Sequence, residues 1–170
     1  MRRRKDERGA SALEFALVAP VLFLLLFGIV DFGFTYNNIQ AVQYAGHEGA
    51  RAAAVGRTGS STSCSPQGTA SSAGASTQQL ICLVKDRAGL DVADTRVKIV
   101  LTADGYALGS HVAVCVQYPL QSWSGALAEL FVGKVTEGKG VARIERLGST
   151  PIEATEEPAV SGSDWSWCTV

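Results

Sequence analysis

The sequence is poor in the residue types that carry most enzymatic and metal chemistry. It has only two histidines, His47 and His111, and one methionine in 170 residues. The histidines have no partner at metal-ligand spacing, and no Gly-flanked nucleophile elbow is present. Three acids, Asp91, Asp94 and Asp104, lie where strand ends and turns are expected, so we interpret them as solvated loop acids. We therefore expect no enzyme, no metal site and no cofactor.

Basic residues are scarce beyond the N-terminus. The first nine residues carry a surplus of three positive charges, whereas the remainder of the chain has a net charge of −4. Phosphate contacts need clustered lysines and arginines, so no nucleic-acid partner is expected.

One long apolar run stands out. Residues 10–30 contain a single charge, Glu14, and as a helix they cover about 31 Å, the thickness of a bilayer core. The basic residues precede this run, so the positive-inside rule predicts a single-pass protein with a cytoplasmic N-terminus and an extracytoplasmic remainder beyond Asp31. A cleaved signal peptide is the alternative. Its small-residue cleavage site is missing until residues 52–54, so we expect a retained anchor.

Four cysteines lie in the predicted exported part. An even number in an oxidising compartment indicates two disulfides, for which three pairings can be written. Pairing neighbours in sequence closes the shorter loops and is favoured, although the sequence does not fix it. The favoured pairs are Cys64 with Cys82 and Cys115 with Cys168.

The helix is expected to continue past the membrane, from about residue 11 to residue 55. Apolar residues recur there at steps of three and four, and Gly56 offers a left-handed stop. A ridge of small residues follows the outer half between Ala45 and Ala53. It either allows close approach of another helix or a sheet, or simply reflects the helix preference of alanine.

The exported remainder contains a polar loop, a short helix and strands. Residues 57–76 are almost entirely Gly, Ser, Thr and Ala, which predicts a mobile loop without core residues, tied at Cys64. A helix over about 77–88 follows, with Ser76 and Gln79 as a capping box and Gly89 as its end.

Alternating residues then predict antiparallel strands. These lie near 96–102 and 112–117, with a further strand near 140–147. The tail ends in Trp165, Trp167 and Cys168, which suggests a docked terminus.

The predicted fold class is α+β: a long N-terminal helix packed on a small antiparallel sheet. Five segments are expected: a basic leader (1–9), a transmembrane half-helix (10–31), an exported amphipathic half-helix (32–56), a Gly/Ser-rich loop (57–76) and a disulfide-tied αβ domain (77–170).

The surroundings of Glu14 explain why a carboxylate stands in an apolar run. The basic leader is followed by Gly9, four residues, Glu14 and the aromatic Phe15. This order resembles the processing site of type IV prepilins, especially those of tight-adherence pili. Together with GIVDFG at the outer edge and HEGAR, in which His47 takes a usually basic or polar place, residues 8–56 resemble a TadE-like domain.

The resemblance implies a function and its site residues. A prepilin peptidase would cut after Gly9, and the new amine of Ala10 would be neutralised by Glu14 of a neighbouring subunit. Phe15 and Pro20 belong to the same assembly segment, and Pro20 is expected to kink or loosen the helix.

The implied role is that of a minor pilin or pseudopilin. Its partners would be other pilins or pseudopilins, the prepilin peptidase, the inner-membrane assembly platform and the lipid bilayer. The alternative is a membrane-tethered binding or adhesion module outside any filament, with Trp165 and Trp167 exposed for ligand capture.

Overall fold

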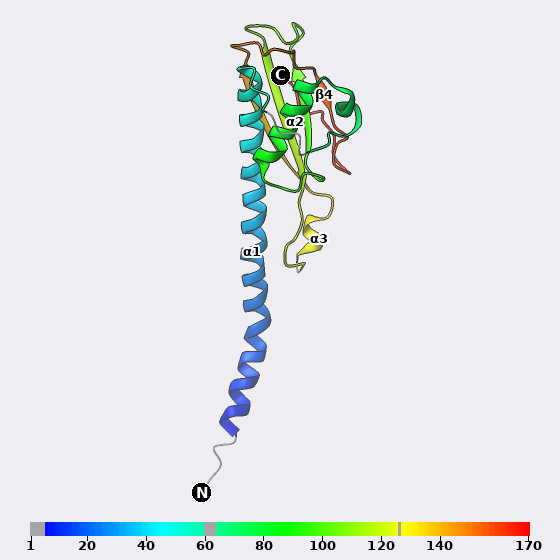
Figure 1. Ribbon diagram of the computed structural model, residues 1–170. Coiled ribbons are helices and arrows are strands. Elements are labelled where there is room, and N and C mark those ends of the chain that lie inside the picture. Colours follow the sequence, from blue (N-terminus) through cyan, green and yellow to red (C-terminus); the bar gives the residue numbers. More distant parts are fainter. Residues whose placement is uncertain (1–5, 60–63, 126) are drawn as a thin grey trace. The chain divides into compact units, whose positions relative to one another are not determined.

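The computed structural model describes residues 6–59, 64–125 and 127–170. The chain forms two compact units. The anchor unit comprises the helix up to Thr35 together with residues 121–132, and the sheet unit comprises residues 36–120 and 133–170. A long N-terminal helix and a four-stranded antiparallel sheet confirm the α+β class (Figure 1).

The first helix, α1 (Asp6–Ala54), is continuous over 49 residues. It ends as predicted, because Gly56 takes a left-handed φ of 67°. The N–H of Gly56 donates to the Ala53 carbonyl and that of Arg57 to the Ala52 carbonyl, so these last carbonyls of α1 are satisfied.

The sheet has the strand order β3-β2-β1-β4. Two strands lie where alternation placed them, β1 (Arg96–Leu101) and β2 (His111–Pro119). Strand β3 (Val135–Arg143) begins and ends earlier than the predicted strand at about 140–147. The prediction missed its start because Gly138 and Gly140, at two of its inward positions, interrupt the apolar alternation. The short β4 (Thr155–Glu156) was not predicted.

The outer half of α1 packs against β3 at backbone distance. A Cβ on Gly138 would lie 2.5 Å from the Val42 carbonyl oxygen, and a Cβ on Gly140 would overlap the Gly46 carbonyl. The contacts Val42–Gly138 and Gly46–Gly140 have nearly the same spacing on both elements, because four helical residues rise about 6 Å and two strand residues about 6.8 Å. The small-residue ridge of α1 is therefore a sheet-packing surface, which decides between its two interpretations.

The second helix, α2 (Ala75–Ala88), covers the same core. A Cβ on Gly49 would lie 2.5 Å from Val84 Cγ2, so only glycine admits α2 this close to α1. Gly89 ends the helix at φ 62°, as predicted. The predicted capping box is wrong, because the N-cap is Gly74 and its N–H donates to Glu153 Oε2 at 3.0 Å. A carboxylate distant in sequence thus supplies what a local side chain was expected to give.

The Gly/Ser-rich segment is partly built into the fold. Residues 60–63 lie outside the described residues, but the 3₁₀ helix η1 (Gly68–Ser72) is present and Ala70 is fully buried. The prediction that the loop holds no core residue is therefore wrong at Ala70. The composition of residues 57–76 does not show that β4, far along the chain, will hold this segment in place.

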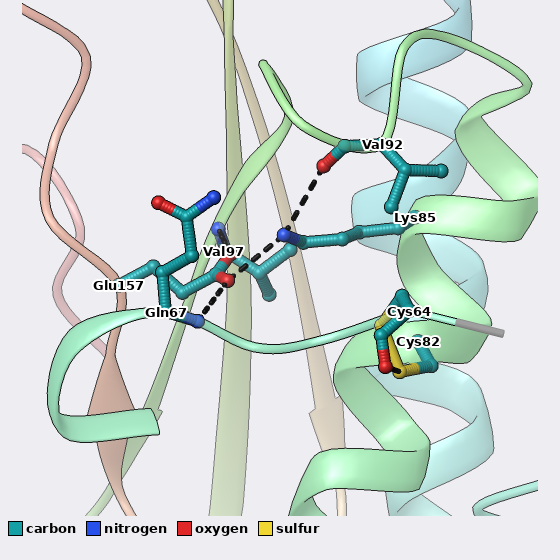
Figure 2. The surroundings of a disulfide bond; sticks show 7 residues. All are labelled: Cys64, Gln67, Cys82, Lys85, Val92, Val97 and Glu157. Atoms are coloured by element: carbon teal, nitrogen blue, oxygen red, sulfur yellow. Dashed lines mark hydrogen bonds and ion pairs between the residues drawn. A yellow bond between two sulfur atoms is a disulfide. The ribbon is translucent and has the colours of Figure 1, made fainter. Parts of the chain in front are cut away.

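A buried ion pair joins four segments of the sheet unit. Lys85 Nζ lies 2.8 Å from Glu157 Oε1, and both side chains are at most 1% exposed. Glu157 also accepts hydrogen bonds from the N–H groups of Gln67 and Val97, at 2.8 and 2.9 Å, and Lys85 donates to the Val92 carbonyl. Figure 2 shows Lys85 between the Val92 carbonyl and the Glu157 carboxylate, with Gln67 and Val97 beside the same carboxylate. Both charges are thus partnered, as burial requires.

Two disulfides complete the sheet unit. They join Cys64 to Cys82 and Cys115 to Cys168, the sequential pairing that loop closure favours. Trp165 is only 8% exposed, and its indole N–H donates to the Glu157 carbonyl at 2.9 Å. The C-terminal segment is docked, as the sequence indicated.

Candidate assembly and membrane surface

The N-terminal part of α1 exposes apolar side chains on all sides. Among the described residues one helix, Gly9–Ala54, is long and apolar enough to cross a membrane. Its large side chains from Leu13 to Ile29 are uncovered; Phe15, for example, is 65% exposed. This exceeds the few hundred Å² of apolar patch that a soluble monomer tolerates. The helix therefore fits a single-pass membrane protein.

The predicted processing and assembly residues share this helix. Gly9, Ala10, Glu14 and Phe15 are all exposed. Among the side chains that the structure describes, no basic group lies within ion-pair distance of the Glu14 carboxylate. Ala10 precedes Glu14 by four residues, about one helical turn or 6 Å, so a new amine there would stand close to the acid.

Pro20 lies inside α1, and the helix continues across it. Proline lacks an amide hydrogen, so the Ala16 carbonyl has no N–H four residues ahead to accept from. The backbone is consequently one hydrogen bond weaker at this point of the apolar run.

A hydrogen-bonded loop covers the outer end of the apolar run. Asp31 is only 1% exposed although it lies on α1. Its Oδ2 accepts from the hydroxyls of Ser122 and Ser124, both at 2.7 Å, and its Oδ1 accepts from the Ser124 N–H at 2.9 Å. The loop is residues 121–132, which connect β2 to β3 and contain the short helix α3 (Ala128–Phe131).

Aromatic contacts reinforce this attachment within the anchor unit. Phe34 stacks on Trp123 with ring centroids 5.5 Å apart, and Phe32 meets Phe131 edge to face at 6.2 Å. The sequence analysis missed Ser122, Trp123 and Ser124. The available signal was one tryptophan between two serines in a mostly apolar stretch, QSWSGALAELF.

The tryptophans of the chain divide into two groups. Trp165 and Trp167 lie against each other, 5.9 Å between centroids, and pack with the Cys115–Cys168 bridge. Trp123, in contrast, is 69% exposed. Ligand capture by the C-terminal pair required exposure, so burial of Trp165 counts against the adhesion-module interpretation.

Comparison with known proteins places the resemblance on this helix. The family model described as TadE-like protein matches residues 9–51. No curated protein and no solved structure matches the chain. The match confirms the TadE-like resemblance of the N-terminal segment. It associates the chain with tight-adherence pili, whose TadE-like components are not known as enzymes.

Proposed function

We propose that the chain is a non-enzymatic minor pilin or pseudopilin that takes part in assembly of a tight-adherence, type IV-like pilus. The observation that carries the proposal is the uncovered apolar helix, which has the TadE-like match and the exposed Glu14. One face of the outer half of the same helix is already covered by its own sheet, although Tyr36 and Tyr44 on the other side are exposed. The N-terminal half, whose large apolar side chains are uncovered, would make the main contacts with other subunits.

Maturation by a prepilin peptidase would remove residues 1–9. The bond after Gly9 lies inside α1, where glycine is a weaker helix former than alanine by about 0.5–1 kcal/mol, so Gly9 lowers the cost of local unwinding for a protease. The N-terminus would face the cytoplasm before cleavage, because the basic residues precede the apolar run.

Glu14 would then register neighbouring subunits. The amine of Ala10 and the carboxylate of Glu14 are each costly alone in hydrocarbon, and pairing them between subunits offsets that cost. The partners would be other pilins or pseudopilins and the membrane assembly platform.

Processing is tested by expressing the full chain with and without a prepilin peptidase and sequencing the mature N-terminus. We expect a start at Ala10, with no cut in Gly9→Leu. Gly28→Leu is a matched control, since a Cβ at either glycine meets nothing within 4 Å. An intact leader beside an active peptidase would refute the assignment.

Assembly is tested with Glu14→Ala and Glu14→Gln in a piliated host that lacks the wild-type chain. Both variants should be cleaved yet be incorporated poorly, because the Ala10 amine loses its anionic partner. Normal piliation with either variant would contradict the registration role.

A further inference from the structure

We propose that residues 121–132 form a second membrane contact, an interfacial loop anchored by Trp123 in the headgroup region of the outer leaflet. The inference rests on the proposed membrane anchoring of α1. It adds a lipid-binding surface in a part of the chain that lies outside the TadE-like match.

The height of the loop along α1 is fixed by Asp31. Three hydrogen bonds hold Ser122 and Ser124 on its carboxylate, and the two aromatic pairs involve helix residues within three positions of it. Asp31 follows Ala10 by 21 residues, about 31 Å of helix, which is one bilayer core. A helix that spans the bilayer from Ala10 therefore brings the loop to the lipid–water boundary.

The composition of the loop suits that boundary. Three large apolar side chains, Trp123, Leu130 and Val132, are 69, 61 and 71% exposed, and the loop carries a single acid, Glu129. Tryptophan prefers the membrane interface because its ring is apolar and its N–H can remain hydrated.

Continuity with the helix favours lipid as the occupant. The exposed loop side chains belong to the same compact unit as the uncovered side chains of α1, including Phe27 and Ile29. Lipid that covers the exposed side chains of α1 therefore also reaches the exposed side chains of the loop. The Asp31 carboxylate, which would be costly at this edge if bare, is sealed by serine hydroxyls and a backbone N–H.

The test measures tryptophan quenching by brominated lipids. The full chain and Trp123→Phe are reconstituted in phosphatidylcholine vesicles, with or without bromines near the glycerol end of the acyl chains. We expect a clear emission loss in the wild-type chain and a much smaller one in Trp123→Phe, because Trp165 and Trp167 pack with the Cys115–Cys168 bridge. Trp123 is exposed, so the substitution should leave the fold intact.

Anchoring of α1 is measured separately. Leu24→Trp in the Trp123→Phe background should be quenched by lipids brominated near the bilayer centre. Quenching of this introduced indole without quenching of Trp123 in the wild-type chain would overturn the interfacial loop and leave the anchor standing; absence of both would overturn the anchor as well. Blue-shifted but unquenched emission from Trp123 would indicate a protein on this surface and would also overturn the proposal.

The serine attachment has its own matched pair of variants. Ser122→Ala with Ser124→Ala should reduce Trp123 quenching, because two of the three hydrogen bonds to Asp31 are lost. Ser71→Ala with Ser72→Ala removes two exposed hydroxyls of η1 and should leave it unchanged. Equal quenching in both double variants would overturn the positioning role of Asp31.

Discussion

Substituting Gly140 by alanine tests the backbone contact between α1 and β3. The added methyl would overlap the Gly46 carbonyl and lie 2.6 Å from the His47 Cα. Ordinary contact begins at about 3.5 Å, so the helix must move away by about 1 Å. No flexible side chain can yield instead, because every nearest atom belongs to the helix backbone.

The expected loss of stability follows from that displacement. Overpacking of a tight core costs about 1–3 kcal/mol, and a clash with backbone belongs at the upper end. A gap of about 0.5–1 Å also forfeits a quarter to a half of each dispersion contact along the ridge. We expect the free energy of unfolding to fall by about 3 kcal/mol, roughly a 150-fold change in the unfolding equilibrium.

The assay is urea unfolding of the full chain in mild detergent, followed by near-ultraviolet circular dichroism of the docked tryptophans. Lys139→Ala is the matched control, since it changes the residue between the two inward glycines on the opposite face of β3. It should alter stability by less than about 0.5 kcal/mol. Equal stability of Gly140→Ala and Lys139→Ala would refute the close-approach argument.

Three further predictions concern the sheet unit. Lys85→Met should lower the free energy of unfolding by about 3–5 kcal/mol, because it leaves the buried Glu157 carboxylate without its cation. Lys98→Ala, the control, breaks a solvated ion pair with Glu156 and should cost about 1 kcal/mol at most. Urea unfolding midpoints distinguish the two variants. Cys168→Ser should cost about 4 kcal/mol, since its bridge closes a separation of 53 residues, and should match the midpoint shift seen on selective reduction. Glu137→Gln should be slightly more stable than the wild type at pH 7, because partial desolvation raises the pKa of Glu137 above its ordinary 4.5, an effect that solvent keeps small at this exposed position. That gain should disappear below pH 4.5, where the wild-type carboxyl is protonated in both states, as urea midpoints across pH would report.

Features set by local periodicity could be predicted from the sequence. The apolar run and its helical continuation fixed α1, and alternation located β1 and β2. Gly56 and Gly89 marked helix ends because left-handed backbone is cheapest for glycine. The processing and assembly residues rest on a motif that lies within the first third of the chain, where the TadE-like match also lies, and their roles stay predictions.

Features set by contacts distant in sequence were missed. The N-cap of α2 depends on Glu153, and the order of the Gly/Ser-rich segment depends on Glu157, which lie 79 and 90 residues from the groups they bind. Asp31 and its serines are likewise separated by more than 90 positions. The early start of β3 was hidden for another reason: two of its inward residues, Gly138 and Gly140, are glycines, which carry no hydrophobic signal yet are required by α1.

The shared acceptor at Glu157 sets the order in which the sheet unit can fold, because it follows in sequence all the groups that bind it. Until residue 157 emerges, the N–H groups of Gln67 and Val97 and the ammonium of Lys85 lack their buried acceptor. Cys64 and Cys82 can oxidise early, whereas Cys115 must wait for a partner 53 residues further along. Completion of the sheet unit therefore waits for the segment that carries Glu157 and its neighbours, and a chain cut short before that segment would leave these buried groups without their acceptor.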